Sequence, residues 1–578
     1  MDSQKLENLL NLALDATPSE REKSLNLSVG YDEADNMWNL IVKYVGSLEN
    51  IRNIGISAVE LLNNYAILTV QESLIDRIAA MDEIVFVEKP KRLNFAVLNG
   101  RSVSCISGVQ EGIEGLYGEG VIIAVIDSGI DYANNVFRNS DGTTRIIGLW
   151  DQTAVPEEGR LPPEGYDIGV YYDSEDINEA LKYDNRTMQQ QVVKSIDTSG
   201  HGTAVAAIAA GNFSQDKSIY LGIAPKSNIL AVKLGLPLEN SFPRTSELMQ
   251  ALDFCVRTSM KLNTPIVINL SFGNTYGSHD GTSLIETYID QVSGVGVNTI
   301  VAGTGNEGAV AGHTSGYVEN QRNTMVELVI ERYEPTINLQ IWKYYVDIFD
   351  IEVITPSGRS ILISGRTAGS YRYGTDLTEL LVYYGEPSPF SQYQEIYIDF
   401  IPRETYITEG IWQIKIYGSR VVYGRYDMWL PAAANLNGSR FTRPTPDTTL
   451  TIPSTARKII SVGAYNGYNN SYADFSGRGF DRTGGIVKPD IVAPGVDITT
   501  AATGGGTITA SGTSFATPFV SGSAALLMEW GIVRGNDMYL YGEKIKAYMI
   551  RGAKQLPGEV SPSEKTGWGA LCLADSFP

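Results

Sequence analysis

Few cysteines, few histidines and no long apolar run limit what this chain can be. Its 578 residues include three cysteines, Cys105, Cys255 and Cys572, and three histidines. Three cysteines so far apart are too few for a disulfide framework or a zinc site, and no apolar stretch reaches transmembrane length. The first 20 residues are acidic and have neither a basic segment nor a long apolar segment, so they do not resemble a secretory signal. We therefore expect synthesis in the cytoplasm and no membrane insertion.

Basic charge is also scarce. Lysine and arginine number 45 against 66 aspartates and glutamates, a net charge of −21, so a nucleic-acid partner is not expected. Apolar residues make up 43% of the chain and glycines number 58, which fits a globular protein rich in turns. A chain of this length is expected to form two or three domains.

The first hundred residues predict a small α+β domain. Strand-like runs alternate with helical apolar spacing, and this β-α-β-α-β order favours an open sandwich of ferredoxin-like type. The strands are expected at 36–45, 65–70 and 84–88, and the helices at 3–14, just after 58 and at 71–81.

A different pattern begins at Cys105. Continuous apolar runs recur, as in parallel strands that are buried on both faces, and helical segments separate several of them. This alternation predicts a doubly wound α/β domain with a parallel sheet. The apolar runs are 120–131, 229–234, 265–270, 298–302, 459–464 and 491–493, and the helical segments are 201–211, 246–260 and 282–292.

Residues 312–444 interrupt this alternation with short β-rich pieces that are dense in tyrosine. Turn residues recur at the spacing typical of an all-β sandwich, so we predict an inserted β-sandwich or jelly-roll domain. An elaborated pair of hairpins is the alternative, but more than a hundred residues need a core of their own. The predicted domains are therefore 1–100, 101–311 together with 445–578, and 312–444.

Three polar residues stand among glycines and alanines at expected strand ends or helix starts. Asp127 ends a buried strand, His201 opens an alanine-rich helix, and Ser514 opens another. A serine hydroxyl becomes a nucleophile only when a base is within reach and a third group orients that base. A helix N-terminus also offers N–H groups to developing negative charge. Each residue alone could be a cap, but together they predict nucleophilic catalysis.

The sequence blocks around these residues resemble those of subtilisin-like serine proteases. They read DSG at 127–129, HGT at 201–203 and GTSFATP at 512–518, in the Asp–His–Ser order of that family. The resemblance covers about residues 105 to 312 and 445 to 578. It implies a serine endopeptidase whose catalytic triad is Asp127, His201 and Ser514.

Further blocks resemble the substrate-binding parts of the same family. Asn306, in GTGNEG at 303–308, matches the residue that stabilises the oxyanion. The block NLSFG at 269–273 matches the strand that pairs with the substrate backbone. The resemblance thus implies a substrate site formed by Ser271, Phe272, Gly273, Ala302, Gly303 and Thr304.

No cofactor is required for this chemistry. The acidic loop 172–176 is a candidate for calcium, which members of the family often bind, although a solvated run of charges is the favoured explanation. His279 and His313 lie in loop-like sequence without ligand spacing, so both are expected at the surface.

The N-terminal domain resembles the family's propeptide, which acts as an intramolecular chaperone. A parallel sheet forms slowly because its contacts are distant in sequence, and a pre-folded partner lowers that barrier. The irregular stretch 91–104 would then occupy the cleft, and self-cleavage is expected between Leu93 and Ser104. Propeptide, missing signal and β insert together resemble the Csp germination proteases of clostridial spores. In that group the propeptide stays bound after cleavage, and the substrate is the zymogen of a cortex-lytic enzyme.

The expected partners are a protein or peptide substrate and the chain's own propeptide, and the protein is expected to be monomeric and associated with the spore. Two other functions remain open. One is a pseudoprotease or scaffold in germination signalling, silenced by a bound propeptide, against which the complete set of triad residues argues. The other is a general degradative protease, which the missing signal disfavours.

Overall fold

The computed structural model describes residues 4–24, 27–32, 35–91, 94–95, 102–111, 115–212, 222–236, 243–365, 367–375 and 377–578. The chain divides into two compact units, each described by itself below. The insert unit comprises 1–92, 274–284 and 307–449, and the α/β unit comprises 93–273, 285–306 and 450–578. Among the described residues, no helix combines the length and apolar character needed to cross a membrane.

A nine-stranded sheet forms the centre of the α/β unit, in the order β26-β25-β13-β11-β7-β10-β8-β9 with β27 beside β25. The strands from β25 to β8 in this order run parallel. The predicted doubly wound α/β fold is confirmed. The strands are β7 (Ile122–Asp127), β8 (Ile146–Asp151), β9 (Val170–Asp173), β10 (Asn228–Lys233), β11 (Ile266–Leu270), β13 (Asn298–Gly303), β25 (Ile460–Asn466), β26 (Ser471–Tyr472) and β27 (Ile491–Pro494).

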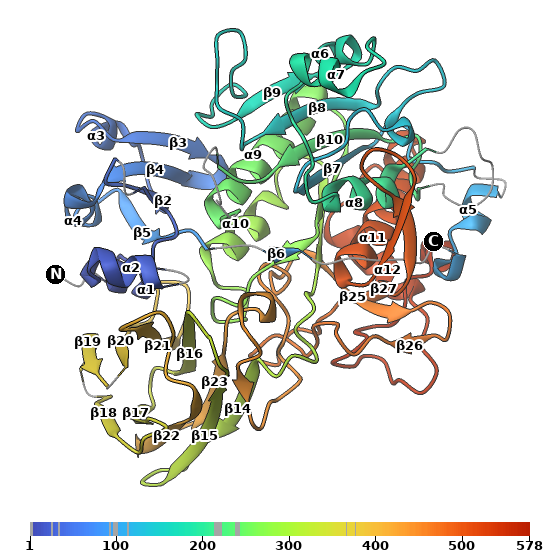
Figure 1. The fold of residues 1–578 in the computed structure, drawn as a ribbon. Helices are drawn as coiled ribbons and strands as arrows, with labels where there is room; N and C mark the ends of the chain where they lie inside the picture. Colours follow the sequence, from blue (N-terminus) through green and yellow to red (C-terminus); the bar gives the residue numbers. More distant parts are fainter. Residues whose placement is uncertain are drawn as a thin grey trace. The chain divides into compact units, whose positions relative to one another are not determined.

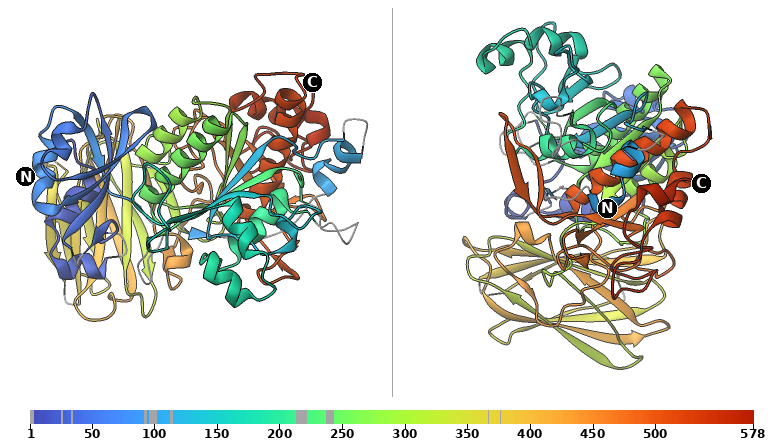
Figure 2. Two further views of the ribbon diagram at one scale, coloured as in Figure 1. Left: turned by 90° about the horizontal axis from the view of Figure 1, so that it is seen from above. Right: turned by 90° about the vertical axis from the view of Figure 1, so that its right-hand side faces the viewer.

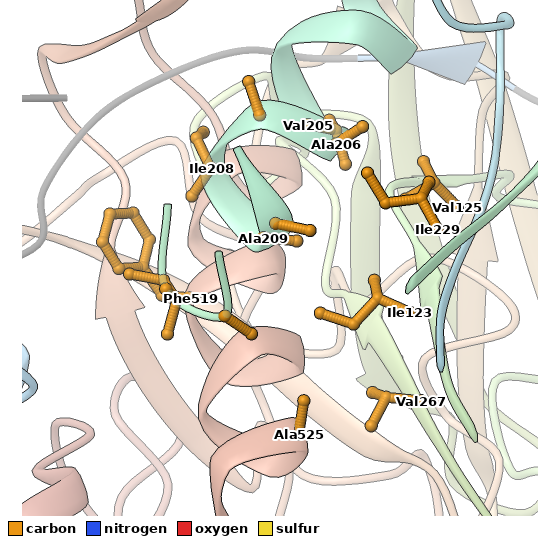
Figure 3. Packing of buried hydrophobic residues seen from close by; sticks show 14 of the residues in the cluster. Ile123, Val125, Val205, Ala206, Ile208, Ala209, Ile229, Val267, Phe519 and Ala525 are labelled. Carbon is orange, nitrogen blue, oxygen red and sulfur yellow. The ribbon is translucent and has the colours of Figure 1, made fainter. Parts of the chain in front are cut away.

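Helices cover both faces of this sheet (Figure 1). Helices α8 (His201–Ala210) and α11 (Thr513–Met528) lie on one side, and α9 (Thr245–Leu262) and α10 (Leu284–Val292) lie on the other. Alanines in α8 and α11 have small side chains, so these helices can pack closely over Ile123 and Val125 of β7 (Figure 3). The fully buried β7 is thereby fixed at the middle of the unit.

Cys105 and Cys572 form a disulfide, a single crosslink that the sequence analysis, which excluded only a disulfide framework, did not predict. Their Cα atoms are 4.9 Å apart although 467 positions separate them in the sequence. Cys255 is a buried free thiol. The disulfide joins the start of the α/β unit to its end.

Replacing Cys105 by serine is expected to lower the stability of the α/β unit by about 2–5 kcal/mol, because the crosslink restricts the unfolded chain. Thermal unfolding with and without a reductant measures this effect. Reductant should lower the Tm of the wild-type protein and of a Cys255→Ala control, but not that of Cys105→Ser. An equal response of all three proteins would show that the disulfide does not form.

The N-terminal part of the insert unit is the predicted ferredoxin-like α+β domain. Its sheet has the order β1-β2-β4-β3, with β5 paired to β2. The helix expected just after residue 58 is wrong: Ser57–Leu61 forms β3 and pairs along β4, while the helix α3 lies earlier, at Glu49–Arg52. Cross-strand pairing outweighs local helical spacing here. The remaining elements are α1 (Asn8–Asp15), α2 (Pro18–Lys23), β1 (Tyr31–Asp32), β2 (Met37–Tyr44), β4 (Tyr65–Gln71), α4 (Ile75–Ala79) and β5 (Ile84–Glu88).

Residues 307–449, the insert, form two antiparallel sheets around one apolar core (Figure 2). The sheet orders are β14-β23-β16-β21-β20-β19 and β18-β17-β22-β15-β24. The predicted β-sandwich is confirmed, whereas its jelly-roll connectivity stays a prediction. The strands are β14 (His313–Tyr317), β15 (Asn323–Ile330), β16 (Ile337–Tyr344), β17 (Ile348–Ile354), β18 (Ser360–Ile363), β19 (Gly369–Gly374), β20 (Thr378–Tyr384), β21 (Tyr393–Pro402), β22 (Gly410–Arg420), β23 (Arg425–Trp429) and β24 (Arg440–Phe441).

The N-terminal domain and the insert share a core inside the insert unit. Apolar residues of α1 and of the sheet pack with Leu381, Tyr383 and Tyr397 of the insert. Arg372 of the insert also pairs with Asp15 at 3.0 Å and with Glu20 at 3.0 Å. The two parts are therefore held by both apolar packing and ion pairs.

A buried acidic group at this contact predicts a pH dependence. Glu395 lies near Glu7, Glu88 and Lys91. Lys91 forms ion pairs with Glu7 at 2.9 Å and with Glu88 at 2.7 Å. Burial, reinforced by Glu7, raises the pKa of Glu395 to about 8.

A carboxyl group whose pKa is raised by folding stabilises the folded state at low pH, and this contribution is lost as the pH rises toward 8. We expect the urea midpoint of the insert unit to fall between pH 5 and pH 8.5, by an equivalent of about 2 kcal/mol. Glu395→Gln should flatten this slope, and the exposed Glu404→Gln should leave it unchanged. Equal slopes for wild type and Glu395→Gln would contradict the assignment.

Candidate functional site

Asp127 is the last residue of β7, the strand from which the sheet continues in two directions. β10 and β8 lie on one side of β7, and β11 and β13 lie on the other. In such sheets, ligands bind beyond the carboxyl ends of the strands at the point where the order reverses. The Asp127 side chain is fully buried. Its Oδ1 accepts hydrogen bonds from His201 Nδ1 at 2.6 Å and from the Ser128 N–H at 2.7 Å.

His201 is the first residue of α8, and Asp197 fixes the turn that precedes it. The Asp197 carboxylate accepts from the Gly200 N–H at 2.9 Å and from the Thr203 N–H at 2.9 Å. It also accepts from the Ser128 hydroxyl at 2.8 Å, and so joins the turn after β7 to the start of α8. Sequence analysis missed this positioning role. The available signal was an aspartate four residues before a histidine at a helix start.

Gly202 allows α8 to approach the turn after β7. A Cβ atom at this position would lie 2.1 Å from the Gly129 carbonyl oxygen and 3.1 Å from Asp127. A side chain here would therefore push the helix, and His201 with it, away from Asp127. The HGT block thus needs its glycine for close approach of the backbone.

Ser514 is the second residue of α11 and is almost fully buried. Its hydroxyl donates to the Ser271 carbonyl oxygen at 2.7 Å, and the Ser271 hydroxyl donates to the Ser514 carbonyl oxygen at 2.8 Å. The next residue, Phe515, meets the His201 ring edge-on, with the ring centroids 5.4 Å apart. The start of α11 is therefore beside the imidazole on one side and the 271–273 segment on the other.

Asn306 lies directly before the start of α11 in space. Its Oδ1 accepts from the Thr513 N–H at 3.0 Å and from the Thr513 hydroxyl at 3.3 Å. Thr513 also receives a hydrogen bond on its hydroxyl from the Gly305 N–H, at 3.0 Å. Because these contacts use Oδ1, they fix the amide plane and turn Nδ2 away from Thr513. The Nδ2 donor takes no part in these contacts with Thr513.

The strand β12 (Phe272–Gly273) follows Ser271 and already carries an added strand. β6 (Asn94–Phe95) pairs with it antiparallel, and in the backbone register Phe272 is opposite Phe95 and Gly273 is opposite Asn94. This is the backbone pairing by which an extended peptide is bound at a sheet edge. Residues 94–95 belong to the stretch that was predicted to enter the cleft. Leu93 and residues 96–101 of the predicted cleavage region lie outside the described residues.

Thr451 is a further site residue that sequence analysis missed. A Cβ atom on Gly273 or on Gly305 would lie 2.4 Å from the Thr451 side chain, so this threonine packs between β12 and the turn before Asn306. Within the described part of the chain, its hydroxyl and that of Thr304 are buried without a hydrogen-bond partner. Ala302 and Gly303 end the parallel strand β13 on the same side. No local signal could identify Thr451, because it comes after the whole insert in the sequence.

Residues 488–490, a Lys-Pro-Asp run that precedes α11 in the sequence, have a structural role in this unit. Asp490 accepts from the Ser461 N–H at 2.8 Å and pairs with Lys488 at 2.9 Å and Lys546 at 2.7 Å. Burial alone would raise the pKa of Asp490, but the two lysines lower it below its ordinary value. Burial also lowers the pKa of Lys488 to about 8. The group holds β25 against β27.

The structure gives the acidic loop and two histidines other roles. The Asp173 side chain caps helix α6 (Ser174–Ala180), and Asp176 pairs with Arg160 at 2.6 Å. Within the described ranges, no group of three or more potential ligands is arranged to hold a metal ion, and calcium binding stays a prediction. The surface placement of His279 and His313 is wrong. Both are buried and stack against Trp429 in the insert unit, a distant contact that their loop-like sequence does not reveal.

Comparisons with known proteins agree with this arrangement. A model of the subtilase family matches residues 118–393 and 428–569, and a model of the Csp protease B prodomain matches residues 4–91. The structure of the Clostridium perfringens CspB protease is similar, with 37% sequence identity and a TM-score of 0.75. The match covers 82% of this chain and 96% of that chain.

Curated plant proteins also match. The subtilisin-like protease SBT1.9 of Arabidopsis thaliana is 28% identical over 170 residues, 27% of this chain and 21% of the relative. The subtilisin-like protease SBT3.12 of the same organism is 23% identical over 460 residues, 74% of this chain and 56% of the relative. These matches cover about one fifth of the length of SBT1.9 and about half of the length of SBT3.12.

Proposed function

The chain belongs to the subtilase family, and from that premise we propose that it hydrolyses peptide bonds with Asp127, His201 and Ser514 as its catalytic triad. The observation that carries the proposal is the 2.6 Å hydrogen bond between His201 Nδ1 and Asp127 Oδ1, made beside the start of α11. The bond directs the other ring nitrogen of His201 away from Asp127. His201 would take the proton of the Ser514 hydroxyl and return it to the leaving amine. Asp127 would hold the tautomer and stabilise the imidazolium.

The oxyanion of the tetrahedral intermediate needs donors that are already in place. Asn306 Nδ2 and the Ser514 N–H at the start of α11 are the groups we assign to this role. The fixed amide plane of Asn306 favours this assignment, because no reorganisation is needed when charge develops. The positive end of the α11 dipole adds to the stabilisation.

Substrate would bind as an extended strand along Ser271, Phe272 and Gly273, in the place that β6 takes. Ala302, Gly303 and Thr304 would form the opposite wall of the pocket, with Thr451 between the two walls. An incoming peptide must compete with the 94–95 strand. This favours a site that stays closed until the propeptide tail leaves.

We further propose that the chain cleaves itself between Leu93 and Ser104. Intact-mass measurement and N-terminal sequencing of purified protein test this step. A new N-terminus within this stretch is the expected result. A protein that remains uncut while its active-site serine is reactive, or one cut elsewhere, would contradict the position.

The natural substrate is proposed from the match to the Csp prodomain and to the Clostridium perfringens CspB protease. We propose limited proteolysis of the zymogen of a spore cortex-lytic enzyme, with the protein monomeric and associated with the spore. Specific cutting of such a zymogen, without degradation of unfolded casein, is the expected result. Efficient casein degradation would favour a general degradative protease instead.

One observation favours the second candidate, a scaffold silenced by its propeptide. The β6–β12 pairing occupies the strand where substrate would bind. A scaffold of this kind would hold its substrate protein without cutting it. Binding of the zymogen with no cleavage over hours, after self-cleavage of the propeptide, would support this second function.

A further inference from the structure

The chain passes between its two units at positions that adjoin the candidate site. Gly273 ends β12 in the α/β unit, and Asn274 begins a segment of the insert unit. Asn306 is likewise followed by Glu307, the first residue of the insert, and the insert ends at Thr449, two residues before Thr451. Residues that are fixed within the insert unit are thus covalently joined to the substrate strand, the oxyanion donor and the pocket.

We call three of the places where the chain crosses between units, 273/274, 306/307 and 449/450, the junctions. Residues 429–433, at the end of β23, contact residues of the insert unit near each junction, and we call this segment the junction clamp. It makes one hydrogen bond near each junction. The three bonds run from Thr275 Oγ1 to the Leu430 carbonyl oxygen (3.0 Å), from the Ala433 N–H to Glu307 Oε2 (3.2 Å) and from the Trp429 indole N–H to the Thr448 carbonyl oxygen (3.1 Å).

Trp429 also lies between two histidine rings. The His279 ring stacks on it with the ring centroids 4.2 Å apart and the planes 12° apart, and the His313 ring stacks at 4.7 Å and 24°. All three side chains are buried. His279 has φ 52°, a left-handed conformation that persists only where the surroundings impose it. The stack therefore holds the 274–279 segment in one conformation.

Gln340 of β16, the cross-strand neighbour of Trp429, holds the same segment from a second strand. Its Oε1 accepts from the Gly277 N–H at 3.0 Å, and its Nε2 donates to the Thr275 carbonyl oxygen at 3.1 Å. The side chain is buried, with 1% of its surface exposed. Segment 274–279 is thus fixed by hydrogen bonds as well as by stacking. The first of its residues held in this way, Thr275, lies only two positions after the end of β12 in the sequence.

We propose that the junction clamp is a positioning element of the active site, which maintains the spacing between the substrate strand, Asn306 and Thr451. This inference rests on the proposed protease function. Catalysis requires the substrate and the oxyanion donor to be placed accurately, and a shift of about 1 Å can reduce the rate about a hundredfold. Trp429, Leu430 and Ala433 act through the residues that they hold. The insert then contributes to catalysis as well as to folding.

A double-mutant cycle on self-cleavage tests the proposal, using pulse–chase measurement of the full chain in cell-free translation. Trp429→Leu removes the stack and the indole N–H, and we expect it to slow self-cleavage about tenfold to a hundredfold. Asn306→Ala should slow the reaction about 100- to 1000-fold, as loss of this donor does in subtilisin. If Trp429 acts through Asn306, then Trp429→Leu should slow the Asn306→Ala chain much less than it slows the wild-type chain.

Trp412→Leu is the matched control, because Trp412 is a buried tryptophan of the insert core that donates to the Thr408 carbonyl oxygen at 2.9 Å. Its effect on the rate should be the same with and without Asn306. Additive effects of Trp429→Leu and Asn306→Ala would overturn the positioning role, while the protease assignment would stand. A wild-type chain that neither cleaves itself nor reacts at Ser514 with a fluorophosphonate probe would instead refute the proposed function.

A smaller change keeps the test valid if Trp429→Leu fails to fold. Thr275→Val removes the hydrogen bond to Leu430 and keeps the side-chain shape, and Thr275→Ser restores the hydroxyl. For peptide substrates that pair along β12, we expect Thr275→Val to raise KM about three- to tenfold with a smaller change in kcat. Thr275→Ser should recover most of this loss. Unchanged KM in Thr275→Val, with the wild type active, would contradict the inference.

Discussion

A Ser514→Ala chain is expected to remain one intact polypeptide, whereas the wild-type chain cuts itself between Leu93 and Ser104. The substitution removes the hydroxyl that we propose as the nucleophile, and the His201 base then has no serine proton to take. In subtilisin, loss of this serine lowers kcat about 10⁶-fold. If the wild-type chain cleaves itself within minutes, a reduction of that size makes cleavage too slow to detect in any practical incubation.

The alanine variant should fold normally. It loses one hydrogen bond, from the serine hydroxyl to the Ser271 carbonyl oxygen, a loss of about 1 kcal/mol, and keeps the rest of α11. Ser523→Ala is the control, because Ser523 is a buried serine of the same helix. Gel analysis should show two fragments for wild type and Ser523→Ala and one band for Ser514→Ala. Cleavage in Ser514→Ala would assign the nucleophile elsewhere.

Asp127→Asn is expected to lower the rate about 10⁴-fold without unfolding the protein. The carboxylate accepts hydrogen bonds from both the Ser128 N–H and His201 Nδ1 on one oxygen. An asparagine that turns its NH₂ group toward the ring would force the opposite imidazole tautomer, which places a proton where the base is needed. The shape of the side chain is kept, so the loss should appear in kcat and not in the unfolding temperature.

The control for this variant is Asp151→Asn. Asp151 ends β8 as Asp127 ends β7, is equally buried, and pairs with Lys233 at 3.4 Å. It should leave kcat within a fewfold of wild type. The pH dependence of the rate adds a second criterion. If Asp127→Asn keeps both the rate and the pH profile of wild type, His201 is not oriented by Asp127.

Much of the fold and of the candidate site followed from local sequence. The apolar run before Asp127 is buried on both faces, as its composition requires, and it became the central parallel strand β7. His201 and Ser514 stand at the starts of α8 and α11 because small residues follow them, and small residues let both helices approach the sheet. Features set by one strand or one helix start could be predicted.

Features that depend on distant contacts could not. The Cys105–Cys572 disulfide joins residues 467 positions apart, and the burial of His279 and His313 arises from their contact with Trp429. Neither cysteine nor histidine spacing carries information on such pairs.

The residues that hold the site in place were missed for the same reason. Asp197 gains its role only when the turn after β7 lies against α8, and Thr451 only when the chain returns from the insert.

The most direct test of the central claim is covalent labelling with a fluorophosphonate probe followed by peptide mass spectrometry. The account predicts one modified residue, Ser514, in the wild-type protein, and loss of labelling in His201→Ala although Ser514 is still present. Labelling of a different residue, or none after the propeptide tail has been cleaved and removed, would contradict the catalytic assignment of Asp127, His201 and Ser514.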